Sequence, residues 1–280
     1  MKLPMFYVDD VIRRALAEDI NYIDVSTAYV IDEDAVSEAY FIAKAPGVLC
    51  GIDVALRVFE MTDPTFKATV YKRDGDKIEK GDLIAEFSGR TAALLGGERT
   101  ALNLLQHMSG VATATARAVA LTEGSKTTIA ETRKTLPGLR ALQKYAVVCG
   151  GGRNHRYNLS DAAMLKDNHI DAGGGIAKTV ALLRERAGHT VKVEVETRNM
   201  DEVREAVEAG ADIIMLDNMT TEQMREAVEY IGDSALTEAS GNITDERIRE
   251  ISAIGVDIIS IGALTHSVTA MDISMRIKIQ

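Results

Sequence analysis

The first hundred residues carry several short hydrophobic patterns of different period. Apolar positions at helical spacing predict an amphipathic helix over residues 8–18 and a second helix over residues 53–61. An apolar and aromatic run at 35–43 and an alternation of apolar and polar positions at 66–71 predict strands. This mixture of short helices and strands favours an α+β domain.

From residue 91 to 123 the pattern is helical throughout, with leucines supplying the apolar face. Gly96-Gly97 and Ser109-Gly110 interrupt it and are predicted to break the helix, because glycine is a poor helix former. The sequence therefore predicts a set of consecutive helices here.

Beyond residue 126, short β-branched runs alternate with helical stretches. The predicted strands are Thr127–Glu131, Ala162–Lys166, Val191–Glu196, Ala211–Asp217, Ala235–Ala239 and Asp257–Gly262. The predicted helices are Ala177–Ala187, Met200–Ala209, Thr221–Tyr230 and Thr244–Ile254. This alternation predicts a parallel sheet covered by helices, and its length favours an incomplete α/β barrel, since a complete one takes about 250 residues.

The predicted fold class is thus α/β, with an N-terminal α+β domain followed by an incomplete parallel α/β barrel. We place the first domain at residues 1–108 and the barrel at residues 109–280, with about the last ten residues able to pack back on the first domain. 

Composition adds little to this picture, since 46% hydrophobic and 26% charged residues are ordinary for a globular chain. No apolar run reaches the length of a membrane span, and the first ten residues lack the basic and then apolar pattern of a secretion signal, so a cytoplasmic location is expected. Cys50 and Cys149 form no CxxC pair, and we expect both to be buried apolar residues rather than disulfide or zinc ligands.

Charge is distributed unevenly along the chain. The protein has a formal net charge of −10, yet residues 131–169 contain seven Lys or Arg against three acids. A local cationic cluster in an acidic protein favours a small anionic ligand over nucleic acid, which binds extended basic surfaces. Arg140 and Lys144, spaced four apart, can instead be explained as an exposed helix face.

Ionisable residues end almost every predicted strand of the barrel. They are Glu131, Lys166, Glu194, Glu196, Asp217 and Glu238. Because barrel active sites lie at the carboxyl ends of the strands, these side chains are expected to meet at one mouth. Strand alternation further predicts that Lys192, Glu194 and Glu196 point into the barrel, unless this is an exposed edge strand with one polar face.

Two loops have the composition of a phosphate site. Ser240-Gly241-Asn242 leads into a predicted helix near Thr244, and Ser260–Leu264 follows the last predicted strand. Glycine after a strand is also common in ordinary turns. The histidines form no HxxxH or HExxH pair, so a protein-bound zinc is not expected.

Three strings taken together resemble one family. ETRKTLPGLRALQKYAV, GGGRNHR and LKDNHI, with GERTALNLLQHMSG before them, are similar to quinolinate phosphoribosyltransferase, over about residues 17–275. The resemblance implies transfer of a phosphoribosyl group from phosphoribosyl diphosphate to quinolinate with loss of CO₂, giving nicotinate mononucleotide and diphosphate in NAD biosynthesis, with Mg²⁺. It also implies a homodimer or a hexamer built from dimers, in which the first domain closes the neighbouring barrel.

Residue by residue, the resemblance assigns roles to matching positions. It implies that the quinolinate carboxylates are held by Arg99, reaching from the neighbouring subunit, and by Arg133, His155, Arg156 and Lys166. Lys134 would meet the diphosphate, and Glu194 and Asp217 would lie near the ribose and the metal, which the protein alone does not hold. The ribose 5-phosphate would lie on Ser240, Gly241 and Gly262.

Two other functions fit parts of the sequence. A paralogue associated with molybdenum utilisation shares the ETRKT region, although the intact LKDNH string favours the quinolinate enzyme. A catalytically silent anion-binding subunit would not need Glu194 and Asp217 beside the cations. The sequence departs from the family pattern at Ile23, Val148, Arg153, Tyr157 and Asn158, next to the matched residues rather than at them.

Overall fold

The chain forms two compact units, each assembled from separate stretches of sequence. A computed structural model describes residues 3–278. The first unit contains the chain up to Ala116, Thr135–Gly151 and the chain from Leu264 onward, and the second contains Arg117–Lys134 and Gly152–Ala263. The division expected at residue 108 treats each domain as one continuous stretch, whereas the chain passes between the two compact units four times.

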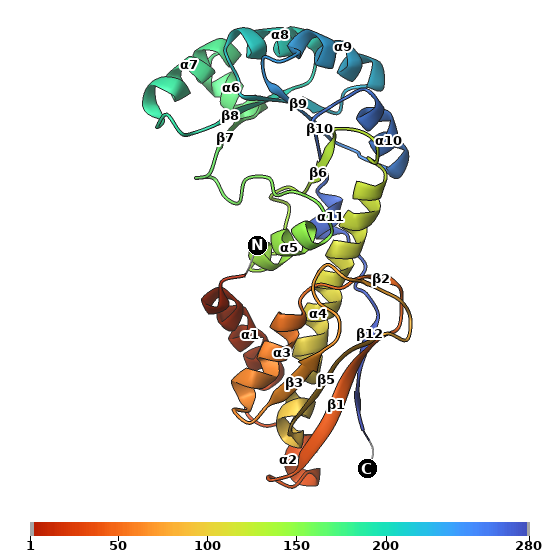
Figure 1. Ribbon diagram of the computed structural model, residues 1–280. Helices are drawn as coiled ribbons and strands as arrows, with labels where there is room; N and C mark the ends of the chain where they lie inside the picture. The colour runs from red at the N-terminus through yellow and green to blue at the C-terminus, as the bar shows by residue number, and fades with distance from the viewer. Residues whose placement is uncertain (1–2, 279–280) are drawn as a thin grey trace. The chain divides into compact units, whose positions relative to one another are not determined.

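An antiparallel sheet of four strands is the centre of the first unit (Figure 1). Its order is β12 (Ile273–Ile277), β1 (Val36–Ala43), β5 (Leu83–Arg90) and β3 (Lys67–Val70). The helices of this unit before residue 91 are α1 (Met5–Asp19), α2 (Val25–Val30) and α3 (Ile52–Thr62), and a short pair joins β2 (Gly47–Val48) to β4 (Lys77–Ile78). The α+β prediction for this part is confirmed.

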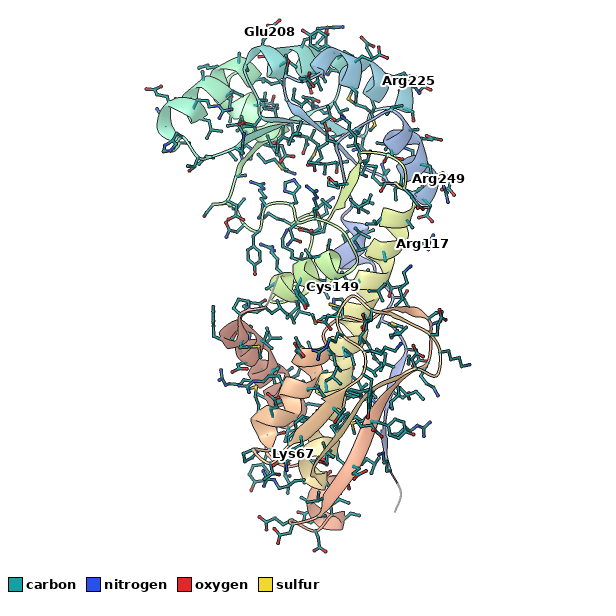
Figure 2. All side chains as sticks on the ribbon, in the orientation of Figure 1. Lys67, Arg117, Cys149, Glu208, Arg225 and Arg249 are labelled. Carbon is teal, nitrogen blue, oxygen red and sulfur yellow. The ribbon has the colours of Figure 1, made fainter. Side chains whose placement is uncertain are left out.

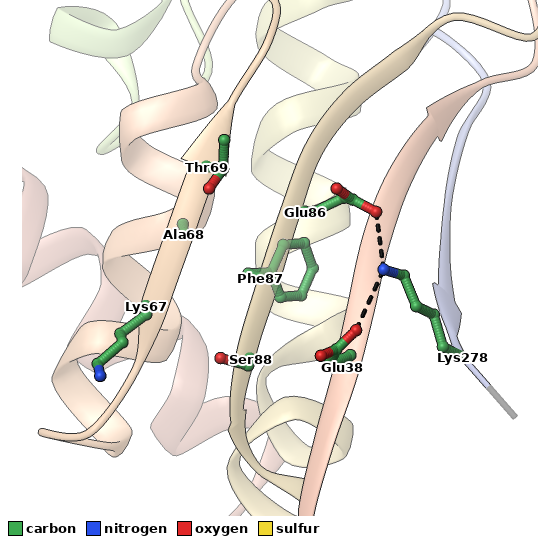
Figure 3. Close-up of a pocket in the computed structure, with 8 residues that line it drawn as sticks. All are labelled: Glu38, Lys67, Ala68, Thr69, Glu86, Phe87, Ser88 and Lys278. Atoms are coloured by element: carbon green, nitrogen blue, oxygen red, sulfur yellow. Dashed lines mark hydrogen bonds and ion pairs between the residues drawn. The ribbon is translucent and has the colours of Figure 1, made fainter. Parts of the chain in front are cut away.

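One face of this sheet is apolar and the other is polar. Phe41, Phe59 and Phe87 meet with ring centroids 4.8–6.2 Å apart and form part of the core between the sheet and α3. On the polar face, Lys278 pairs with Glu38 at 3.1 Å and Glu86 at 2.8 Å (Figure 3). The C-terminal segment is therefore joined to two neighbouring strands, because β12 also pairs with β1 along its length.

A single helix of 30 residues, α4 (Thr91–Ala120), occupies the region where breaks were predicted. That prediction is wrong because the glycines allow close packing instead of ending the helix. A Cβ on Gly110 would lie 2.3 Å from the carbonyl oxygen of Thr269, and one on Gly97 would lie 3.0 Å from the ring of Phe59. Both residues leave room for a neighbouring segment, at a modest cost in helix propensity.

Helix α5 (Arg140–Cys149) also belongs to the first unit. Lys144 is 1% exposed, so the interpretation of Arg140 and Lys144 as an exposed helix face is wrong for the lysine. Gln143, also buried, accepts a hydrogen bond from the backbone N–H of Leu136 and donates to the carbonyl of Thr265. The contact with Thr265 joins the segment Thr135–Gly151 to the segment that begins at Leu264.

The second unit is a parallel sheet of six strands (Figure 1). Its order is β6 (Thr128–Ala130), β11 (Ile258–Ser260), β10 (Leu236–Ser240), β9 (Ile213–Asp217), β8 (Val193–Thr197) and β7 (Ala163–Leu165). The connecting helices are α6 (Asp167–Gly173), α7 (Ile176–Arg186), α8 (Met200–Glu208), α9 (Thr221–Ile231), α10 (Asp245–Ala253) and the short α11 (Ala263–His266). The predicted incomplete α/β barrel is confirmed, and α6 is an additional helix that the sequence analysis did not predict.

Helices α8, α9 and α10 start at good N-cap residues. Asn199, Thr220 and Thr244 accept hydrogen bonds from backbone N–H groups in the first turn of the helix that follows. Figure 2 labels charged residues on each of these helices, Glu208, Arg225 and Arg249. The helices turn such residues to solvent and their apolar stripes to the sheet, as the 3.6-residue period predicted.

Strand β8 is buried on both faces. Val193 and Val195 are at most 1% exposed, and Glu194 between them is 1% exposed. The alternative of an exposed edge strand with a polar face is therefore wrong. Lys192 precedes the strand, is mostly exposed and pairs with Asp212 at 2.7 Å, so it does not belong to the buried charges. Within residues 3–278, no helix is both long and apolar enough to cross a membrane.

Candidate active site

A cavity of about 550 Å³ opens at the carboxyl ends of the strands of the second unit. Every residue that lines it belongs to this unit. Four of the lining residues are the cations Arg133, Lys134, Arg156 and Lys166. Arg133 and Lys134 follow β6 and Lys166 follows β7, so the strands deliver cations that are distant in sequence to the same end of the sheet.

Arg133 and Arg156 lie close enough to influence each other. Burial lowers the pKa of Arg156 from its ordinary value, and the neighbouring charge of Arg133 lowers it further. Arg156 is held in place by a hydrogen bond of 2.9 Å from its guanidinium to the carbonyl of Ala162. Two guanidinium groups crowded together in a cavity favour an anion between them, because it would relieve their mutual repulsion.

His155 lies between two buried carboxylates beneath these cations. Its Nε2 is 3.3 Å from Glu194 and 3.4 Å from Glu238, and each glutamate is at most 2% exposed. Burial alone would lower the pKa of His155, but the two carboxylates outweigh it and raise the pKa to about 10. Burial raises the pKa of Glu194, which His155 opposes. His155 is therefore a permanent cation near neutral pH.

Backbone hydrogen bonds fix the position of His155. Its backbone N–H donates to the buried Glu131 at 3.2 Å, and its Nδ1 lies 2.6 Å from the backbone nitrogen of Arg156. Its Nε2 faces the two glutamates. Glu131, at the end of β6, thus orients the loop that carries both His155 and Arg156.

Polar and acidic side chains line the cavity together with the cations. Glu196 lies 3.4 Å from Lys166, and Asp217 accepts a hydrogen bond of 2.8 Å from the side chain of Asn218. The Asn218 side-chain oxygen in turn accepts a bond of 2.9 Å from Asn242. These bonds connect the ends of β9 and β10 at the edge of the cavity.

The backbone at these two strand ends has an unusual conformation. Asn218 and Asn242 have φ angles of 53° and 48°, which non-glycine residues adopt rarely, although asparagine does so more readily than most. Gly241 has a φ of 90°, and a Cβ there would lie 2.3 Å from Asn218 Oδ1. Strained backbone of this kind is common at ligand sites. Only glycine therefore fits at position 241 without moving Asn218.

The structure brings together most of the residues that the sequence analysis selected. Those lining the cavity are Arg133, Lys134, His155, Arg156, Lys166, Asp217, Ser240 and Gly241. Glu194 instead lines a second cavity of about 530 Å³ at the amino ends of the strands, which shares His155 and Arg156 with the first. Gly262 lies outside both sets of lining residues, and Arg99 belongs to α4 in the first unit.

Several residues that the geometry places in the site had no individual role predicted from the sequence, although Asn242 and Ser260 belong to the two candidate phosphate loops. Glu196, Asn218, Asn242 and Ser260 line the cavity, and Glu238 completes the environment of His155. Glu196 and Glu238 had been noted as strand-end acids, so the rule that found them was sound. Asn218 carried no signal in the sequence, because its importance comes from its backbone conformation.

The N-terminus of α10 is less suited to phosphate than predicted. Thr244 already caps it, and Asp245 and Glu246 occupy its first turn, where they would repel an anion. The loop Ser240–Asn242 before it nevertheless lines the cavity directly. Any phosphate contact would therefore come from this loop.

Comparison with known proteins agrees with this geometry. Residues 24–109 match the family model described as quinolinate phosphoribosyl transferase, N-terminal domain, and residues 111–276 match that of the C-terminal domain. The chain belongs to the quinolinate phosphoribosyltransferase family. The family resemblance expected from the sequence is confirmed.

Relatives of this quinolinate phosphoribosyltransferase family member cover nearly its full length. A Bacillus subtilis (strain 168) protein named probable nicotinate-nucleotide pyrophosphorylase [carboxylating] is 44% identical over 262 residues, covering 94% of this chain and 90% of its own. The Arabidopsis thaliana protein named nicotinate-nucleotide pyrophosphorylase [carboxylating], chloroplastic, is 43% identical, covering 98% of this chain and 84% of its own.

Solved structures of the family have the same fold. NadC from Streptococcus pyogenes superposes with a TM-score of 0.95 at 42% identity, covering 99% of this chain and 98% of its own. The nicotinate-nucleotide pyrophosphorylase from Francisella tularensis has a TM-score of 0.93 at 40% identity, with the same coverage of the two chains. The arrangement of elements in each unit therefore belongs to a known enzyme family.

Proposed function

We propose that the protein transfers the phosphoribosyl group of phosphoribosyl diphosphate to quinolinate with loss of CO₂, giving nicotinate mononucleotide and diphosphate. The observation that carries this proposal is the cavity that Arg133, Lys134, Arg156 and Lys166 line together with Asp217. Both substrates are multiply anionic, and this cavity offers four cations together with the acids Glu196 and Asp217.

The cluster of Arg133, His155 and Arg156 suits the pyridine dicarboxylate. Guanidinium groups bind carboxylates through paired hydrogen bonds, and His155 adds a fixed positive charge below them. Lys166 completes this side of the cavity, where Glu196 holds it. The pyridine ring would thus be oriented by charge, with its nitrogen directed at the ribose.

The remaining part of the cavity suits phosphoribosyl diphosphate. We assign Lys134 to the diphosphate and Ser240 and Gly241 to the ribose 5-phosphate, with Gly262 completing that cradle. Asp217 would lie near the ribose carbon, whose positive charge grows as diphosphate leaves. Glu194 acts from below through His155 in this assignment, because it is buried and does not line this cavity.

The carboxylate oxygens that line the cavity suit Mg²⁺. Asp217 and Glu196 supply carboxylates, and Mg²⁺ typically uses one or two of these together with substrate phosphates and water. When bound, Mg²⁺ would neutralise charge on the departing diphosphate. The three groups of His155, Glu194 and Glu238 also converge, but the protonated imidazole makes that cluster a poor cation site.

Decarboxylation needs no protein nucleophile in this proposal. The pyridine nitrogen displaces diphosphate from the ribose carbon and becomes cationic. The bond from the adjacent ring carbon to its carboxylate then breaks, its electron pair is stabilised by the cationic ring, and a proton replaces the CO₂. The protein contributes position and charge, as preorganised sites do.

We further propose that the active form is at least a homodimer. Arg99 is mostly exposed and its side chain has only a long contact of 3.5 Å to Glu98, which leaves it able to contact substrate in another copy. Around α2, the apolar residues Tyr22, Val25, Tyr29, Val30 and Val36 are all more than half exposed. A patch of this kind commonly marks a protein interface.

The test is an assay of the purified protein with quinolinate, phosphoribosyl diphosphate and Mg²⁺, in which CO₂ and nicotinate mononucleotide are measured together. Equal amounts of the two products are expected. Nicotinate in place of quinolinate serves as the control, because it lacks the carboxylate that is lost. Quinolinate binding without CO₂ release would instead support the silent anion-binding subunit, and no binding at all would leave the molybdenum-associated paralogue.

A further inference from the structure

The two cysteines of the chain meet in the first unit, away from the cavity. Cys50 and Cys149 are 99 positions apart in sequence, yet their sulfur atoms and a carboxylate oxygen of Asp74 all lie within 4.8 Å of one another. Cys50 is fully buried, whereas Cys149, at the end of α5 and labelled in Figure 2, is partly exposed. The prediction that both cysteines are buried is confirmed for Cys50 and is wrong for Cys149.

Asp74 is held firmly in this cluster. Its Oδ1 accepts hydrogen bonds from the backbone N–H groups of Gly51 and Ile52, at 2.8 and 3.0 Å. Its Oδ2 accepts one hydrogen bond of 2.9 Å, from the hydroxyl of Tyr145. A carboxylate oxygen accepts two such bonds, so Oδ2 retains one acceptor position.

A helix-capping role explains the hydrogen bonds of Asp74 Oδ1 but not the position of the rest of the cluster. The bonds to Gly51 and Ile52 satisfy N–H groups at the start of α3, which is an ordinary reason to place an aspartate there. It does not explain why two thiols lie close to this carboxylate.

We propose that Cys50, Cys149 and Asp74 form a binding site for a thiophilic divalent cation such as Zn²⁺. Two thiolates and one carboxylate are a ligand set that Zn²⁺ accepts, with the fourth position open to water on the side of Cys149. Ligands of a tetrahedral Zn²⁺ lie roughly 3.3–3.8 Å apart, so side-chain shifts of about 1 Å close the observed arrangement around the ion.

The surroundings of Asp74 have the form expected around a metal ligand. Ligating carboxylates are usually oriented by further hydrogen bonds, and here the N–H groups of Gly51 and Ile52 and the hydroxyl of Tyr145 provide them. The three ligands come from the segment before α3, the turn after β3 and the end of α5. A bound ion would therefore join three separated segments of the first unit.

A disulfide is the competing explanation, and the geometry favours it less. It would need the two sulfur atoms to approach to about 2.05 Å, and it would leave the convergence of Asp74 unexplained. The metal site uses all three groups. The two explanations also differ in the state of the protein that they require, because the metal binds only the reduced thiols.

The experiment is a titration of the reduced protein with Co²⁺ as a spectroscopic substitute for Zn²⁺. Because the chain has only two cysteines, any thiolate-to-metal charge-transfer absorption reports on this cluster and not on His155 with its glutamates. One equivalent of Co²⁺ is expected to give this absorption, and Zn²⁺ is expected to displace it and to raise the unfolding temperature.

Variants separate the metal site from simple structural roles. Cys149→Ser should abolish the absorption. Asp74→Asn keeps an oxygen for the N–H groups of Gly51 and Ile52 but loses the anionic ligand, so it should weaken Co²⁺ binding at least about tenfold. Asp76→Asn, a nearby exposed turn residue, is the matched control and should bind like the parent protein.

Three results would overturn the proposal. They are a reduced parent protein without charge-transfer absorption, absorption that persists in Cys149→Ser, and unchanged affinity in Asp74→Asn. If the reduced protein fails to bind but forms an internal disulfide under mild oxidation, the cluster is a redox pair instead. Turnover of quinolinate is measured separately in each variant, and the proposal does not depend on it.

Discussion

At the scale of single residues, the site works by opposing charges held at fixed positions. Arg133 and Arg156 lie close enough that one lowers the pKa of the other, while His155 below them is kept protonated by two buried glutamates. Both arrangements raise the free energy of the folded protein, since like charges repel and burying an ion costs free energy. An anionic substrate would resolve the first of these conflicts.

Replacing Arg133 with alanine should abolish turnover without unfolding the protein. The guanidinium is expected to supply a paired hydrogen bond to a carboxylate, and the loss of one such contact in a desolvated site costs about 100-fold or more in kcat/KM. Steady-state kinetics and a thermal melt measure the two effects. Arg204→Ala, on the outer face of α8, is the control and should retain full activity. Near-normal turnover of Arg133→Ala would remove the assignment.

The pH dependence of stability should show the protonated state of His155. Its pKa is raised to about 10 in the folded protein, compared with about 6.5 in an unfolded chain. Its contribution is therefore complete below pH about 6.5 and is lost as the pH rises through about 10. Between these values the parent protein should lose more stability than His155→Gln, as measured by denaturant unfolding. Parallel curves would contradict the charged imidazole.

At the scale of elements, the glycines of α4 show where the sequence was misleading. A glycine inside a helical pattern can end the helix, allow a close contact or have no special role. Which of these applies depends on the segment that packs against it. Gly110 faces the carbonyl of Thr269, which is 159 positions away along the chain. No local pattern contains that information.

The two kinds of helical glycine should respond oppositely to alanine. Gly110→Ala should destabilise the protein by about 1–3 kcal/mol, because the new Cβ would lie 2.3 Å from a backbone oxygen. Gly96→Ala should be neutral or stabilise by up to about 1 kcal/mol, because its Cβ meets only the end of the Ile20 side chain. Denaturant unfolding measures both, and equal effects would show that packing does not distinguish them.

The local sequence pattern was sufficient to predict the strands of the barrel and most of the residues that line the cavity. The rule that parallel strands present their carboxyl ends together placed Arg133, Lys166 and Asp217 in one site. Alternation also put Glu194 and Glu196 on the same side of β8. Alternation does not predict that Glu194 is buried beside His155 while Glu196 faces the cavity. The depth of a side chain within a barrel depends on the tilt of its strand and on the neighbouring strands.

At the scale of the whole molecule, the question is how Arg99 reaches a substrate. The cavity is lined entirely by the second unit of one chain, and Arg99 belongs to the first. The homodimer that we propose makes each active site a product of two chains. This can be tested without a structure of the dimer.

Mixing two inactive variants should restore activity if Arg99 acts in the neighbouring subunit. In a dimer of Arg99→Ala with Arg133→Ala, one of the two sites contains both arginines. Random pairing of equal amounts should therefore recover roughly a quarter of the parent activity after subunit exchange. Each variant alone should remain inactive. No recovery, with mixed dimers confirmed by mass, would place Arg99 outside the neighbouring site.

The pairing of β12 with β1 has a consequence for how the protein is made. The strand that completes the edge of the first sheet is synthesised well after its partner, because Met275 follows its partner Phe41 by 234 positions. Domains usually fold as they leave the ribosome, in order from the N-terminus. Here the early sheet keeps one edge open until the residues of β12 have been made. A premature stop before Ile273 would leave that edge without its partner and prone to aggregation.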